Sequence, residues 1–273
     1  MSLYRFMNIE KTMDVLNNKR LTLSNPLYFN DPFDCSLAIN DSDEEYIRKY
    51  EEYPTVPIQC GNMIFKNPYT REINAYTNLI NKAVVGKDIG EKEKWRICCF
   101  SQQQNWPEQI LMWSLYADDH KGCMLEFTDD FENYLRQGYK VKKVQYHKNR
   151  IHLNFSDINN KQAKQNKAYQ ALYYKSPAWK NEKEVRVLIP TDAFNSENED
   201  LLQISQNDGT IREFIKIRPE WIKKVYMGAK ISGTDQKNIE DATSELGIQS
   251  EQVRLCAVNY ELHPKSQSHT KKQ

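Results

Sequence analysis

Two carboxylates stand two positions apart in W-K-N-E-K-E-V-R, the segment from residue 179 to residue 186. On a strand, Glu182 and Glu184 would project to the same face. One carboxylate of such a pair can stabilise positive charge that develops on a sugar carbon, while the other orients an acceptor. The alternative is a solvated strand edge, where ion pairs with the neighbouring lysines are worth under ~1 kcal/mol each.

An arginine and several aromatic residues are also candidates for ligand binding. Arg5, near the start of a short predicted strand, can hold a pyrophosphate through paired hydrogen bonds. Tyr116 offers an apolar ring with a polar edge for a planar ligand. In the alternative interpretation Arg5 pairs with an acid such as Asp31 or Asp34, and Tyr116 and Trp113 are core aromatics.

A basic stretch runs from residue 136 to residue 186, with thirteen Lys and Arg against three Asp and Glu. Aromatic residues alternate with these charges, as in grooves that bind phosphates or single-stranded nucleic acid. The alternative is an ordinary solvated basic face. The candidate anion-binding residues are Lys161, Lys164, Lys167, Lys180 and Arg186.

Several common kinds of site are not indicated. Ser101, Asp118 and His120 have the residue types of a hydrolase triad, but closeness in sequence does not create triad geometry. The glycines form neither a dinucleotide-binding nor a P-loop pattern. The five histidines show no ligand spacing, so no metal site is predicted, and the six cysteines are expected to be reduced core thiols.

The pattern of elements predicts an α+β protein, because strands and helices mix without a regular βαβ rhythm. We expect two facing, mainly antiparallel sheets with strands near residues 4, 98, 125, 143 and 187. The expected organisation is one domain over residues 1–262, with a helical insertion at 41–95 and a disordered polar tail at 263–273. Net charge is +1, and neither a targeting segment nor a membrane span is recognised, so a cytoplasmic location is expected.

Three segments together resemble the bacterial domain of unknown function 2971 family. The first is L-Y-R-F-M-N followed by F-N-D-P-F-D, the second is C-F-S followed by W-S-L-Y-A-D-D-H-K-G, and the third is W-K-N-E-K-E-V-R. They occur in the family's order along nearly the whole chain. The family name itself implies no activity.

The order of elements is also similar, more distantly, to the ADP-ribosyltransferase fold, in the branch that modifies nucleic acid. That resemblance implies an enzyme that cleaves NAD and transfers ADP-ribose to a nucleic acid or a protein, as a bacterial toxin or phage-defence effector. It implies Glu184 as the catalytic glutamate, with Glu182 beside it. The implied NAD-binding residues are Tyr4, Arg5, Ser101, Trp113 and Tyr116. The alternative is a non-catalytic nucleic-acid or nucleotide-binding module on the same fold.

Overall fold

The computed structural model describes residues 2–52, 58–60, 63–65, 67–85, 87–102, 109–195 and 198–265. The chain divides into two compact units, each built from separate stretches of sequence. Unit 1 comprises residues 1–24, 94–144 and 178–273, and unit 2 comprises residues 25–93 and 145–177. No linker composition in the sequence indicated this division. The expected insertion at 41–95 lies almost wholly in unit 2, together with residues outside its predicted bounds.

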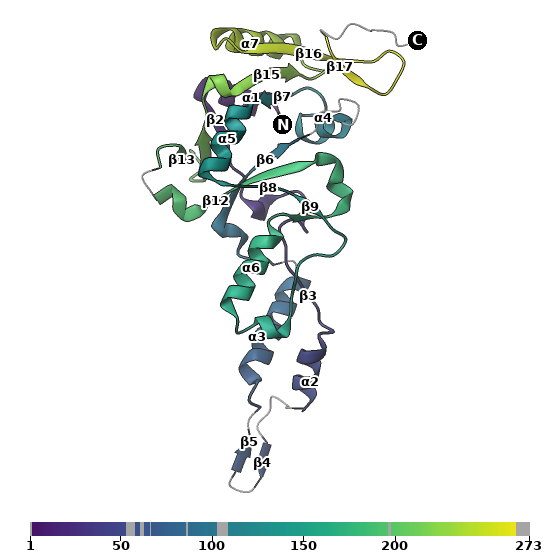
Figure 1. Cartoon of the computed structure of the whole chain (residues 1–273), viewed down its shortest axis with the longest axis vertical. Helices are drawn as coiled ribbons and strands as arrows, with labels where there is room; N and C mark the ends of the chain where they lie inside the picture. Colours follow the sequence, from purple (N-terminus) through teal and green to yellow (C-terminus); the bar gives the residue numbers. More distant parts are fainter. Residues whose placement is uncertain are drawn as a thin grey trace. The chain divides into compact units, whose positions relative to one another are not determined.

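Unit 1 is built on an eight-stranded sheet, most of whose strands are labelled in Figure 1. All its pairings are antiparallel except that of β15 with β16. In order across the sheet the strands are β17 (Leu262–Pro264), β16 (Gln249–Leu255), β15 (Ile222–Met227), β7 (Cys123–Phe127), β1 (Tyr4–Met7), β6 (Trp95–Ser101), β12 (Glu184–Pro190) and β8 (Lys140–Lys143). The α+β class is thus confirmed, and strands occupy all five of the predicted positions.

A weak seam crosses the middle of this sheet. β1 and β6 meet at one pair, Tyr4 with Ser101, whereas β6 and β12 are paired at seven positions. Farther along, the edge of β6 bonds instead to Ser24, whose N–H and C=O lie 2.8 and 2.9 Å from their partners on Ile97. Two facing sheets were expected, but the structure has one continuous hydrogen-bonded sheet. A single residue pair joins its two halves at the centre, and we call this junction the β1–β6 seam.

Ser24 lies two residues after β2, a strand of a second, smaller sheet of unit 1. Its strands, in order, are β13 (Leu201–Ser205), β14 (Ile211–Lys216) and β2 (Arg20–Thr22). The antiparallel pairing of β2 with β14 places the chain at Ser24 beside β6. β6 is thus bonded to β12 on one edge and to Ser24 on the other.

Alternating side chains give the large sheet two different faces. One face carries Cys98, Phe100, Val185 and Val187 and contributes to the main hydrophobic core. The other carries Phe6, which packs in a smaller cluster with residues of α4. The helices of unit 1 are α1 (Ile9–Asn18), α4 (Ile110–Tyr116), α5 (Asp129–Gly138) and α7 (Gly233–Glu245).

Helix starts in unit 1 follow from local sequence. The side chain of Asn8 accepts a hydrogen bond from the backbone N–H of Lys11 and so caps α1. Ser232 caps α7 in the same way, accepting from the N–H of Asp235. These caps fix helices that cover the main core.

Unit 2 is mostly helical, with short strand pairs. Its helices are α2 (Glu44–Glu52), α3 (Thr70–Val84) and α6 (Lys161–Ala171), and its strands are β3 (Ala38–Ile39), β4 (Ile58–Cys60), β5 (Met63–Phe65), β9 (Gln145–Tyr146), β10 (His152–Leu153) and β11 (Tyr174–Lys175). The β4–β5 hairpin is a departure from the helical segment expected there. Tyr46, Tyr76 and Phe155 pack their rings together at centroid distances of 5.0–5.8 Å. Aromatic packing thus holds α2 and α3 against the segment that precedes α6.

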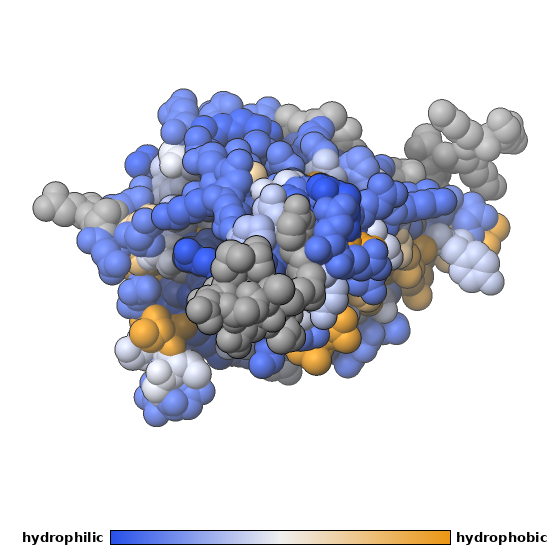
Figure 2. Space-filling model, turned by 90° about the horizontal axis from the view of Figure 1, so that it is seen from below, coloured by the Kyte–Doolittle hydropathy of each residue, from blue (hydrophilic) through white to orange (hydrophobic). Residues whose placement is uncertain are grey.

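The prediction of a disordered tail from residue 263 is wrong at its start, because His263 and Pro264 belong to β17. The rest of that prediction, from residue 266, lies outside the described residues. Within the described ranges, none of the helices has the length and apolar character that crossing a membrane requires. The face drawn in Figure 2 is mainly hydrophilic, and its hydrophobic residues form small separate groups.

Candidate functional site

A row of polar side chains crosses one face of the large sheet. Tyr4 is paired with Glu126 on β7 and with Ser101 on β6, and Ser101 is paired with Glu184 on β12. Directly paired residues share a face, and neighbouring strands lie ~4.8 Å apart. We call these four residues the polar row, and it crosses the sheet at the β1–β6 seam. Ser101, Glu126 and Glu184 are buried, at 2%, 6% and 6% exposure.

Glu126 is the member of the row that sequence reasoning missed. Its carboxylate accepts hydrogen bonds from the Tyr226 hydroxyl at 3.1 Å and from Lys223 Nζ at 2.8 Å. Burial raises the pKa of Tyr226, and the nearby Glu126 raises it further. Burial and Glu126 raise the pKa of Tyr4 as well. Both phenols therefore stay protonated at neutral pH. The sequence did contain one sign of a buried acid here, because Glu126 stands inside the otherwise apolar run C-M-L-E-F.

Glu182 and Glu184 are both buried, but they do not lie on one strand as predicted. Glu182 ends the 3-10 helix η5 (Pro177–Glu182), Lys183 has a left-handed backbone with φ of 45°, and β12 begins at Glu184. The solvated strand edge is also excluded, since the two glutamates are 5% and 6% exposed.

Three of the predicted residues meet around Glu182. The Tyr116 hydroxyl donates to Glu182 Oε1 at 2.5 Å, and the Ser101 hydroxyl donates to the backbone carbonyl of Glu182 at 2.7 Å. Ser101 is also the cross-strand partner of Glu184. Tyr116, Ser101, Glu182 and Glu184 are therefore brought together, and we call them the seam site.

Glu184 is held by a buried arginine. Arg186 is completely buried, and its Nε and Nη2 donate to the two carboxylate oxygens of Glu184 at 2.7 and 3.0 Å. The prediction that Arg186 contacts a polyanion is therefore corrected, because its guanidinium is buried and bonds to Glu184 inside the protein. Cys99 is paired with Arg186 across the strands. Burial raises the pKa of the Cys99 thiol well above its usual value, and the Glu184 carboxylate raises it further.

Arg5 lies on the opposite face from the polar row, because it follows Tyr4 on β1. Its guanidinium donates to Cys98 Sγ and to the carbonyl of Thr22, both at 2.7 Å, and lies 5.9 Å from the centre of the Phe100 ring. It therefore bridges the strands at the β1–β6 seam from the main-core side. The structure does not bring Arg5 to the seam site. Asp31 and Asp34, its partners in the alternative interpretation, belong to unit 2.

Trp113 is a core residue. Its side chain is 0% exposed and packs edge-on against Phe6, with ring centroids 5.3 Å apart. The structure thus supports the alternative interpretation for Trp113, whereas Tyr116 is only half-buried and reaches Glu182. The hydrolase triad does not form: Ser101 donates to Glu182, and the His120 ring stacks on Trp113.

The remaining lysines are divided between the two units. Lys161, Lys164 and Lys167 lie on α6 of unit 2, and Lys180 is exposed in unit 1. Lys167 Nζ bonds to Asp157 at 2.6 Å, so its charge is offset within the protein. Lys161 is exposed and Lys164 is half-buried. Lys161 and Lys164 therefore give α6 a basic surface in unit 2, whereas Lys180 belongs to the other unit.

The W-S-L-Y-A-D-D-H-K-G segment has a structural explanation. Asp118, Asp119 and His120 all have left-handed backbones, with φ of 47°, 51° and 71°, and they close the end of α4. A Cβ on Gly122 would collide with the carbonyl oxygen of Met7, so only glycine fits there. The turn costs backbone strain, and it anchors α4, which carries Tyr116, against β1.

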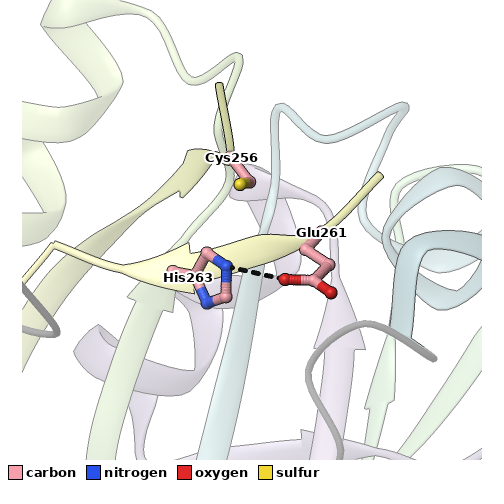
Figure 3. A group of neighbouring side chains, drawn as sticks. All are labelled: Cys256, Glu261 and His263. Atoms are coloured by element: carbon pink, nitrogen blue, oxygen red, sulfur yellow. Dashed lines mark ion pairs between the residues drawn. The ribbon is translucent and has the colours of Figure 1, made fainter. Parts of the chain in front are cut away.

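A group of potential metal ligands lies elsewhere in unit 1, in the β16–β17 hairpin (Figure 3). One ligand atom each of Cys256, Glu261 and His263 lies within 4.8 Å of the others, and all three residues are half-buried. Sequence reasoning missed this group. Its only clues were a histidine two positions after a glutamate and a cysteine at the far side of a turn.

Comparison with protein families gives a match over part of the chain. Residues 112–187 match the model of a family described as "Protein of unknown function (DUF2971)". This supports the family resemblance.

The matched stretch contains most of α4, including Tyr116, and the start of β12. Glu182 lies two residues before β12, and Glu184 is its first residue. No curated protein and no solved structure matches the chain. The family description states no activity, so a function has to be argued from the seam site.

Proposed function

We propose that unit 1 is an ADP-ribosyltransferase-like enzyme, which cleaves NAD and transfers ADP-ribose to a nucleic acid or a protein. The observation that carries the proposal is the seam site, where two buried carboxylates, a serine and a tyrosine gather at the single-pair junction of β1 and β6. The resemblance to the ADP-ribosyltransferase fold implies two sheets, and in this chain the β1–β6 seam, with its single pair, is the feature nearest to such a division.

The chemistry needs a carboxylate at this position. When the bond between ribose C1′ and the nicotinamide nitrogen breaks, its electron pair leaves with nicotinamide and positive charge develops on the sugar. A carboxylate that is hydrogen-bonded to the neighbouring 2′-hydroxyl stabilises that charge. A carboxylate already held in position needs little reorganisation as the charge develops. Arg186 fixes the Glu184 carboxylate through two hydrogen bonds. Glu184 is therefore the proposed catalytic group.

Glu182 has a different proposed role. Its carboxylate accepts a hydrogen bond from the Tyr116 hydroxyl, which holds the acid and the aromatic ring side by side. In the proposed reaction the acceptor attacks C1′ with a lone pair, and its proton passes to Glu182. Tyr116 would contact nicotinamide with its ring. Arg5 takes no part in contacting NAD; it acts by holding the strands at the seam.

One observation favours a second candidate, a nucleotide-binding module without turnover. Both oxygens of Glu184 are engaged by Arg186, and a fully buried bidentate pair is also what a structural ion pair looks like. In that case the seam site binds a nucleotide without cleaving it. The two candidates differ in whether nicotinamide is released.

The experiment uses the full chain and NAD labelled in its adenylate half. Free nicotinamide and labelled macromolecules are measured separately, with single-stranded DNA, RNA and protein extract as acceptors. The proposal predicts nicotinamide release and label on one class of acceptor. Glu182→Gln should preserve hydrolysis of NAD and reduce transfer to the acceptor. NAD binding with no release under any of these conditions would replace the enzyme by the binding module.

A further inference from the structure

The last hairpin of unit 1 brings together a thiol, a carboxylate and an imidazole. Cys256 follows β16, and Glu261 and His263 lie just before and on β17 (Figure 3). The backbone N–H of Cys256 donates to the carbonyl of Glu261 at 2.9 Å, which continues the β16–β17 pairing by one step. Cross-strand pairing and alternation therefore put all three side chains on one face of the hairpin.

Their separations are close to those of ligands around one ion. His263 Nε2 lies 3.2 Å from Glu261 Oε2, and all three ligand atoms lie within 4.8 Å of one another. Around tetrahedral Zn²⁺, neighbouring ligand atoms are ~3.3–3.6 Å apart, given zinc–ligand bonds of about 2.0–2.3 Å. The oxygen and nitrogen already meet this spacing. The sulfur lies at most 4.8 Å from the other two atoms, so it needs to move by no more than about 1.5 Å, within the reach of side-chain rotation.

Charge and ligand type select the ion. A thiolate and a carboxylate together neutralise one divalent cation, and a neutral imidazole completes the set. Zn²⁺ accepts sulfur, nitrogen and oxygen ligands together, whereas Mg²⁺ and Ca²⁺ take oxygen. The backbone N–H of Asn259 points to Cys256 Sγ at 3.4 Å, a contact that supports negative charge on sulfur.

We propose that Cys256, Glu261 and His263 form a zinc-binding site with three protein ligands and one position open to water. Binding displaces the thiol proton to the solvent, and the thiolate, the carboxylate and the imidazole nitrogen each donate an electron pair to the ion. The hairpin is anchored on its other face by Leu262, which is 2% exposed in the smaller hydrophobic cluster.

The site has a structural consequence for the turn that it closes. Val258 and Tyr260, within the turn, are 89% and 97% exposed, so little packing holds the turn in place. A zinc ion joining Cys256 to His263 would tie its two ends together. The competing explanation is that Glu261 and His263 form an ordinary half-buried ion pair near the surface, which contributes little and requires no cysteine.

The test is a titration of the reduced, metal-free full chain with Co²⁺ and then Zn²⁺. A thiolate bound to Co²⁺ gives a near-ultraviolet charge-transfer band, and Zn²⁺ should displace it at one equivalent per chain. Cys256→Ala should abolish the band, and His263→Ala should weaken binding at least ~100-fold. His152→Ala, at an exposed histidine of β10, is the matched control and should bind like the parent.

Arg254 supplies a second control inside the same hairpin. It stands directly across from His263 and carries positive charge on the ligand face. Arg254→Gln should leave zinc affinity unchanged or make it tighter. Absence of the cobalt band in the parent would overturn the proposal, as would equal Zn²⁺ affinity in the parent and Cys256→Ala. All readouts are independent of NAD, so they stand whether or not the seam site is an enzyme.

Discussion

Replacing Arg186 by methionine removes the cation from the buried Glu184–Arg186 pair and keeps most of the side-chain volume. The arginine is 0% and the glutamate 6% exposed, and two hydrogen bonds of 2.7 and 3.0 Å join them. Removing one partner of a buried ion pair costs about 3–5 kcal/mol. We therefore expect Arg186→Met to lower the free energy of unfolding of unit 1 by that amount.

The protein contains a matched control for this substitution. Glu132 and Arg136 also form a two-bond pair, but the Arg136 side chain is 43% exposed. Because water replaces its hydrogen bonds, Arg136→Met should cost less than about 1 kcal/mol.

Urea unfolding followed by tryptophan fluorescence measures both variants. All five tryptophans of the sequence fall within the segments of unit 1. The double variant Glu184→Gln/Arg186→Met should be more stable than the sum of the single losses predicts, because it leaves no unpaired charge. If Arg186→Met costs no more than Arg136→Met, the interpretation of a strongly coupled buried pair is wrong.

Three further predictions concern packing, pH and charge. Gly122→Ala should cost about 1–3 kcal/mol or more in the same unfolding assay, since its Cβ meets the Met7 carbonyl; an unchanged midpoint would contradict the tight contact. Burial raises the pKa of the Cys123 thiol to about 12, so the thiol form favours folding, and this contribution is lost as the pH rises toward that value. Unfolding free energies at neutral pH and about pH 10 should differ less in Cys123→Ala than in the parent; equal slopes would refute this. Replacing Lys161, Lys164 and Lys167 of α6 together by Glu should weaken binding of single-stranded nucleic acid and flatten the salt dependence of that binding. Unchanged affinity and an unchanged salt slope would show that α6 is not part of such an interface.

The strands could be predicted because their residues alternate or form apolar runs. R-I-C-C-F-S and C-M-L-E-F became β6 and β7, and E-V-R-V-L-I-P became β12. Pairing could not be predicted in the same way, because it depends on contacts between distant segments. The bridge from Ser24 to Ile97, which limits β1 and β6 to one pair, leaves no local mark in the sequence.

The candidate site was predicted in part. Ser101, Tyr116, Glu182 and Glu184 were chosen by residue type and order, and the structure brings them together. Arg5 was misplaced, because which face a strand residue occupies depends on its register with the neighbouring strand.

Arg186 and Trp113 were chosen for charge and aromaticity, and both proved to be fully buried. Burial of a charged residue is rare without a partner. Sequence alone did not reveal that a partner of Arg186 stands two residues away, at Glu184.

We propose that Glu184 stabilises positive charge in the cleavage of NAD. The test is to measure nicotinamide release by Glu184→Gln, by the parent and by Glu132→Gln, at a temperature where all three are folded. Turnover of Glu184→Gln should fall by at least ~10²-fold and its NAD affinity should change far less, because the interaction strengthens mainly in the transition state. Glu132→Gln should match the parent. Full turnover by Glu184→Gln would contradict the claim.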